Sequence, residues 1–169
     1  IDNGATVVGG DKVEVGYVSS DVSRNGDLFI KNGGSLTVDN LSVNTGASVT
    51  ITGGLLDVET LTILDGASFT IDAANFTSGV YQALDLSMNA EDAAAVLDKI
   101  TITNVGAGVE VLKKEDGDII FTKVSADTIY INSNWTNKQY GEDLGEGKYL
   151  GFNAFSSIPA ASEIDENTT

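Results

Sequence analysis

Hydrophobic and polar residues alternate in short stretches through the first half of the chain. In each stretch, two apolar residues enclose one small polar residue, as Leu36 and Val38 enclose Thr37. This is the period of a β-strand, which predicts that the apolar pair faces a core and the polar residue faces solvent. The enclosed residues are Thr37, Ser42, Thr50, Asp57, Thr62 and Thr70.

The stretches belong to a tandem repeat of 20 residues. Residues 33–52 are followed without a gap by residues 53–72, and ten of the twenty positions are identical. Turn-forming residues separate the stretches: Asp39 with Asn40, residues 44–46 and residues 52–54. Repeats of this length indicate stacked coils. We therefore expect an all-β fold, a parallel β-solenoid with three short strands per coil of about 20 residues, each coil adding about 4.8 Å.

Weaker copies of the pattern flank the two clear coils. Residues 9–31 read as a degenerate first coil, in which Gly26 matches Gly46 with one residue deleted before the strand. No helix or charged hairpin precedes this coil, so we expect its outer face to be open. The alternation of Ile100 and Ile102 predicts that a further coil resumes there.

One short helix is predicted as an insertion on the flank of the coils. Asn89 can cap it, and Glu91 and Asp92 suit the positive end of its dipole. Its apolar residues share one face. They are Ala93, Val96, Leu97 and Ile100.

Residues 109–124 are predicted to form a hairpin that closes the stack. Asp116 and Gly117 give a two-residue turn signal, which would place Leu112 opposite Phe121. The same register places Glu110 opposite Lys123. From residue 126 the composition changes, and six of the twelve aromatic residues lie in this last part of the chain. We therefore expect two units, a solenoid with its hairpin over residues 1–125 and an aromatic-rich capping or assembly module over residues 126–169.

Composition excludes several partners. The chain has 25 acidic and 9 basic residues, a formal charge of -16, and a single arginine, Arg24. Binding to nucleic acid or to an anionic membrane surface requires clustered cations, so neither is expected. No apolar stretch is long enough for a transmembrane helix, and no cysteine is present. The chain begins with Ile1 rather than methionine, which suggests a processed or excised segment.

The coil motifs Gly-Gly-x-Leu-x-Val and Gly-Ala-Ser-x-Thr-Ile resemble passenger repeats of bacterial autotransporter-type and related right-handed β-helix proteins of the cell surface. Residues 127–135 and 149–158 look like the opening of a further β-helix module in such proteins. The sequence departs from that opening at Pro159, where a continuous helix is expected. The resemblance implies an extracellular role in surface display, adhesion or scaffolding, and it supplies no ligand residues.

Calcium is the cofactor that the acidic residues suggest. Asp116 and Asp118 place two carboxylates in one turn, but six to eight oxygen ligands on a constrained loop are the norm. We expect turn residues rather than a metal site, and no cofactor. Catalysis is not expected either, because Arg24 is the only arginine and Asp57 is the only titratable residue at the outward positions.

Two functions remain open. The first is an extracellular structural module of a surface appendage, filament or adhesin stalk, whose partners are copies of itself or neighbouring repeats. Pairing with the first coil would use the C-terminal residues Ile129, Tyr130, Ile131, Phe152 and Phe155. The alternative is an adhesin domain that binds a host or matrix glycan. Its stacking platform would be Trp135, Tyr140 and Tyr149, although such aromatics more often form a small core.

Four Asn-x-Ser/Thr sequons complete the candidate sites. In an archaeal or eukaryotic export route they could carry glycans, whereas in a bacterial protein they are chance matches. They begin at Asn40, Asn75, Asn134 and Asn167.

Overall fold

The fold is seen in a computed structural model. It describes residues 1–19, 23–76, 79–107, 109–113, 117–123, 130–138, 144, 145, 148, 150 and 154–156. These residues form β-strands for the most part, and α1 (Ala90–Leu97) is the one α-helix among them. The predicted all-β class is therefore confirmed.

The two clear coils pair in the register that the repeat predicts. β6 (Ser35–Val43) runs parallel to β8 (Leu55–Ile63), and β7 (Ser48–Thr52) runs parallel to β9 (Ser68–Asp72). Each residue lies beside the one 20 positions later, as in the pair Val38 and Val58. The inward residues of these strands are buried.

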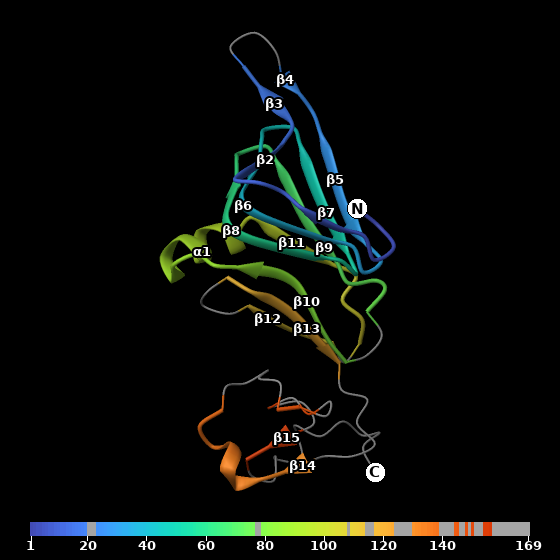
Figure 1. The fold of residues 1–169 in the computed structure, drawn as a ribbon, viewed down its shortest axis with the longest axis vertical. Helices are drawn as coiled ribbons and strands as arrows, with labels where there is room; N and C mark the ends of the chain where they lie inside the picture. The colour runs from blue at the N-terminus through green and yellow to red at the C-terminus, as the bar shows by residue number, and fades with distance from the viewer. Residues whose placement is uncertain are drawn as a thin grey trace.

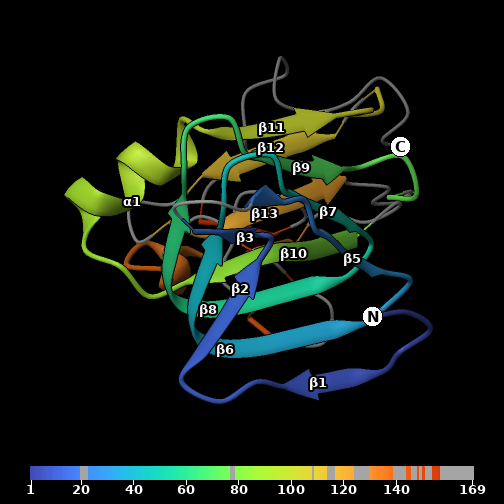
Figure 2. The same cartoon turned by 90° about the horizontal axis from the view of Figure 1, so that it is seen from above.

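Each coil contains two strands rather than three. β6 continues through Asp39 and Asn40, which were predicted to be a turn, and β8 does the same one coil later. Asp39 and Asn40 are both exposed, so the inward series resumes at Leu41 instead of Asn40. The strand bends at this point and serves two sides of the coil (Figure 2).

The first coil begins earlier than predicted. β6 has two arms, residues 35–38 before the bend and residues 40–43 after it. β1 (Thr6–Val8) runs parallel to the first arm and β2 (Lys12–Val15) runs parallel to the second. β5 (Asp27–Lys31) runs parallel to β7, with Leu28 beside Val49. Between β2 and β5, the antiparallel pair β3 (Tyr17–Val18) and β4 (Ser23–Arg24) projects from the corner that residues 44–47 occupy in the next coil (Figure 1).

The last strands make the longer sheet mixed, so the predicted parallel β-solenoid is not confirmed. β10 (Gly79–Leu86) is parallel to the first arm of β8 and antiparallel to β13 (Ile119–Lys123). β12 (Glu110–Lys113) pairs antiparallel with β13, which gives the order β1-β6-β8-β10-β13-β12. β11 (Ile100–Thr103) completes the second sheet, β11-β9-β7-β5, which is parallel throughout.

β12 and β13 pair antiparallel, as the two arms of the predicted hairpin would, but the register is shifted by one residue. Residues 114–116 of the predicted turn lie outside the described residues. Leu112 lies beside Ile120 instead of Phe121, and Glu110 lies beside Thr122 instead of Lys123. β13 is not a free hairpin arm, because it also pairs with β10, where Phe121 lies beside Tyr81. In the pairing with β10, Ile119 and Phe121 belong to the buried core. We attribute the shifted register between β12 and β13 to this constraint on β13.

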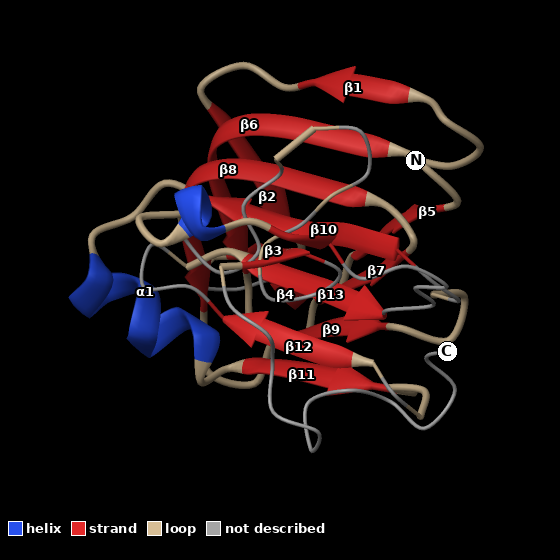
Figure 3. Cartoon of the chain, turned by 90° about the horizontal axis from the view of Figure 1, so that it is seen from below, coloured by secondary structure: helices blue, strands red, loops and turns tan. Residues whose placement is uncertain are grey.

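The predicted helix is confirmed on the flank of the coils (Figure 3). The Asn89 side chain accepts a hydrogen bond from the backbone N–H of Asp92, as an N-cap should. Ala93, Val96 and Leu97 are buried against the core, whereas Ile100, predicted on the same helical face, lies on the following strand at Ile100–Thr103. In the described part of the chain, no helix has the length and apolar character needed to cross a bilayer.

The C-terminal elements are drawn apart from the two sheets, beyond β12 and β13 (Figure 1). They are β14 (Tyr130–Ile131), the 3₁₀ turn η1 (Ser133–Trp135) and β15 (Ala154–Phe155). β14 and β15 pair in parallel. The predicted module boundary near residue 125 lies outside the described residues.

Candidate functional site

The strongest candidate is the first-coil edge, the outer sides of β1, β2 and β5. β1 and β5 are the end strands of their sheets, and within the described residues no strand pairs with the outer side of either. Large apolar side chains are exposed here: Val7 at 41%, Val8 at 76% and Phe29 at 51%. An unpaired edge with apolar side chains is a template for another strand.

Ile1 already uses part of this edge. Its terminal ammonium donates to the carbonyl of Phe29 at 2.8 Å, and the N–H of Lys31 donates to the carbonyl of Ile1 at 3.0 Å. This is the bonding pattern of a parallel bridge opposite Ile30. Asp2 follows, and a hydrogen bond from the Asn32 side chain holds the pKa of its carboxyl below the usual value, with Lys31 adding to the effect.

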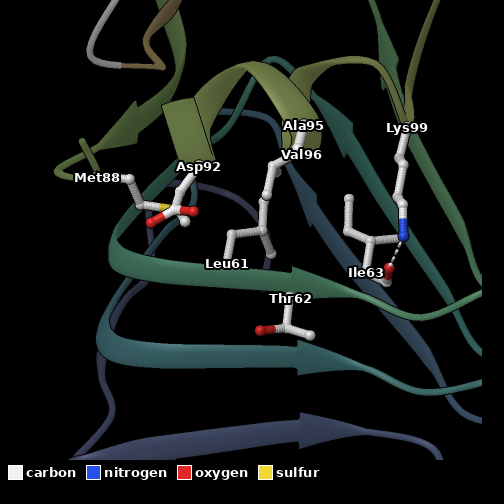
Figure 4. A pocket seen from close by; sticks show the side chains of 8 residues that line it. All are labelled: Leu61, Thr62, Ile63, Met88, Asp92, Ala95, Val96 and Lys99. Atoms are coloured by element: carbon white, nitrogen blue, oxygen red, sulfur yellow. Dashed lines mark hydrogen bonds between the residues drawn. The ribbon is translucent and has the colours of Figure 1, made fainter. Parts of the chain in front are cut away.

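A cavity of about 240 Å³ lies between α1 and the second arm of β8 (Figure 4). Leu61, Met88 and Val96 form its apolar wall, and Asp92 and Lys99 also line it. Sites for small organic ligands are usually about 300–1,000 Å³, so this cavity is smaller than such a site. The helix α1, which forms one wall, lies over the part of β8 that β10 does not pair with.

Of the two predicted calcium ligands, Asp118 makes a structural hydrogen bond. Asp118 is 7% exposed, and its Oδ1 accepts the backbone N–H of Leu86 at 3.1 Å. Asp116 lies outside the described residues. Among the residues that are described, no three His, Cys, Asp or Glu side chains are grouped as a metal site would need. Calcium binding stays an unfavoured hypothesis.

The predicted sugar platform is seen only in part. Trp135 lies on η1 and is half-buried, whereas Tyr140 and Tyr149 lie outside the described residues. Tyr130 is a nearby aromatic in the sequence, and Lys148 Nζ lies 5.0 Å from the centre of its ring. That is the geometry of a cation–π contact.

Two of the predicted assembly residues are exposed on β14. Tyr130 is 38% exposed and Ile131 is 49% exposed. Ile131 lies beside Phe155 in the two-residue ladder of β14 and β15. Ile129 and Phe152 lie outside the described residues.

Three of the sequon asparagines are exposed, namely Asn40, Asn75 and Asn134. The Asn40 amide donates to the carbonyl of Asp11 at 2.8 Å, a bond that a glycan on this nitrogen would weaken. Asn167 lies outside the described residues.

The repeat pattern gave no indication of an aromatic cluster in which Phe121 is buried and Phe76 and Tyr81 are half-buried. The Tyr81 ring lies 5.8 Å from that of Phe121 and 6.1 Å from that of Phe76. Its hydroxyl donates to the carbonyl of Gly54 at 2.6 Å, and burial raises the pKa of Tyr81 to about 12. β10 carries Tyr81 at a point where the 20-residue period is lost, so no register could place it beside Phe121.

The sequence pattern also did not predict a pair of neighbouring carboxylates. Asp57 on β8 lies in register with Asp85 on β10, and Thr37 Oγ1 donates to Asp57 Oδ2 at 3.2 Å. Glycosidases place two carboxyl groups on either side of a bond to be cleaved. Asp57 and Asp85 instead stand side by side on one sheet, which concentrates negative charge there.

The chain was compared with family models, curated proteins and solved structures, and none of the three comparisons gave a match.

Proposed function

We propose that the chain is a non-enzymatic, extracellular structural module of a surface appendage or adhesin stalk. In this proposal residues 1–125 are a short β-solenoid with a terminal hairpin, which spaces and joins its neighbours. The parallel in-register stacking of β5, β7, β9 and β11 supports the solenoid. The proposed location rests on the resemblance of the coil motifs alone to passenger repeats of autotransporter-type surface proteins.

One observation carries the proposal, the first-coil edge. It presents backbone groups and exposed apolar side chains at one end of the stack. At the other end of the longer sheet, β12 is a short strand with Glu110 and Lys113 exposed, which disfavours strand addition. Assembly is therefore head-to-tail, with the C-terminal segment of one copy joining the first coil of the next. Heterologous contacts of this kind extend into filaments.

Sedimentation velocity of the full chain and of residues 1–125 tests the proposal. The formal charge of -16 opposes association, so the full chain should assemble more strongly at high salt. Residues 1–125 should stay monomeric, with circular dichroism as the check that they are folded. Two monomeric species at high concentration and high salt would contradict the proposal.

Glycan binding is the second candidate, and the incomplete burial of Trp135 favours it. Binding on a glycan array that Trp135→Ala abolishes would establish this function. Assembly without any glycan affinity would leave the structural role.

A further inference from the structure

The outer edge of β5 is built to accept a parallel strand. Along the other edge, Ser48 N–H donates to the Gly26 carbonyl and Asn32 N–H donates to the Thr52 carbonyl. Strand geometry then directs the backbone groups of Asp27, Phe29 and Lys31 outward. Ile1 bonds to two of these groups, which establishes both their direction and the parallel sense.

The order of side chains along β5 recurs on β14. Phe29, Ile30 and Lys31 give an aromatic, an isoleucine and a polar residue, and residues 130–132 give Tyr, Ile and Asn. In the parallel sheet, one column of inward isoleucines runs through every strand: Ile30, Ile51, Ile71 and Ile102.

We propose that β5 of one copy accepts the Tyr130–Ile131 strand of a second copy, in place of Ile1. Ile131 would extend the isoleucine column beside Ile30, and Tyr130 would lie next to Phe29. All three of Phe29, Tyr130 and Ile131 are substantially exposed in the single chain, and cross-strand aromatic pairs are favourable. The proposal rests on the head-to-tail assembly above and names the two strands that meet.

The contact has to be between copies. Figure 1 draws β14 at the opposite end of the molecule from β3 and β4, with β12 and β13 between β14 and the sheet that contains β5. Ile1 competes with the incoming strand, because both need the carbonyl of Phe29 and the N–H of Lys31. A chain that starts at Asn3 should therefore assemble more readily than the full chain.

The absence of cysteine from the chain allows a clean test by disulfide trapping. Phe29→Cys and Tyr130→Cys are made in separate full-length chains, mixed at high salt and oxidised mildly. Neighbouring residues in a parallel ladder lie about 4.8 Å apart, within the usual Cα separation of a disulfide. A chain carrying both Thr50→Cys and Thr70→Cys, which lie side by side on β7 and β9, calibrates the yield.

Two mixtures serve as controls for the Phe29→Cys chain. Thr62→Cys gives an exposed cysteine in the second arm of β8, and Thr101→Cys gives one on β11, the other end strand of the same sheet. We expect the Tyr130→Cys mixture to give about tenfold more mixed dimer than the Thr62→Cys mixture. We also expect that yield to rise when residues 1 and 2 are removed.

The outcomes separate this proposal from the one on which it rests. If the full chain associates in sedimentation, residues 1–125 stay monomeric and Tyr130→Cys cross-links no better than Thr62→Cys, the named strands are wrong while head-to-tail assembly stands. Preferential cross-linking to Thr101→Cys would show instead that β11 is the donor. If sedimentation detects no association, both proposals fail.

Discussion

The side-chain ammonium of Lys99 donates a hydrogen bond to the backbone carbonyl of Ile63 at 2.8 Å. β10 pairs only with the first arm of β8. Among the described residues, no strand continues beside the second arm, where Ile63 lies. Lys99 follows α1, so the helix and its lysine together cover an edge that would otherwise be open.

Replacing Lys99 by alanine should destabilise the protein by about 1 kcal/mol, because the Ile63 carbonyl loses its donor in a partly buried position. Urea denaturation measures the change. Lys12→Ala is the matched control, since Lys12 forms an exposed ion pair with Glu14, and it should cost less than about 0.5 kcal/mol. Equal losses would show that the Lys99 bond contributes nothing specific.

Val58→Asp tests the inward register of the coils. Val58 is 1% exposed between Val38 and Leu86, so an aspartate there would be a buried, unpaired charge. The cost should be several kcal/mol, enough to unfold the chain at room temperature. Thr62→Asp places the same charge at an exposed position and should cost less than about 1 kcal/mol. Similar melting temperatures for the two variants would refute this register.

Asp57 and Asp85 should repel each other across β8 and β10. A double-mutant cycle with Asp57→Asn, Asp85→Asn and the double variant isolates that term from other contacts of either residue. We expect an unfavourable coupling of about 0.2–1 kcal/mol at low ionic strength that shrinks as salt is added. A coupling that is zero at low salt, or that is unaffected by salt, would contradict the expectation.

The raised pKa of Tyr81 leads us to expect that the folded chain loses stability in alkali. Its pKa is raised from 10.0 to about 12 in the folded chain, so its contribution is intact below pH 10 and is lost as the pH rises toward 12. Alkaline titration of the five tyrosines, followed by phenolate absorbance, should show one late group. Tyr81→Phe should remove that late group and flatten the fall in stability over this range, compared with Tyr17→Phe, which alters an exposed ring.

Gly54→Ala should be strongly destabilising. A Cβ at this position would lie 2.8 Å from the carbonyl oxygen of Gly34 and 2.7 Å from Ile30 Cγ2, so successive coils would have to separate. We expect a loss of about 2 kcal/mol or more in thermal or urea unfolding. Gly10→Ala is the control, because its Cβ would meet nothing within 4 Å, and it should change stability by less than about 0.5 kcal/mol.

The coil register could be predicted because it depends on local periodicity. Val38 and Val58 occupy the same position in the 20-residue repeat, and stacking of successive repeats puts them side by side. The helix cap at Asn89 was predictable for a similar reason, since capping involves only residues within one turn.

The bend at Asp39 and the register of the hairpin were not predictable in this way. Both residues of the pair Asp39 and Asn40 favour turns, yet hydrogen bonds to the next coil keep β6 continuous through them. In the hairpin, the Asp116 and Gly117 signal suggested one register, and pairing of β13 with β10 imposed another.

Three features depend on local information and can be predicted from the residues alone: the alternating strands, the repeat length and the capped helix. Three other contacts arise from the packing of the whole chain: Ile1 bridges to β5, Tyr81 packs on Phe121, and Asp57 lies beside Asp85. Each of these pairs joins residues 28 or more positions apart, outside the exact repeat. Their register depends on how the whole chain packs, because no local period relates one partner to the other.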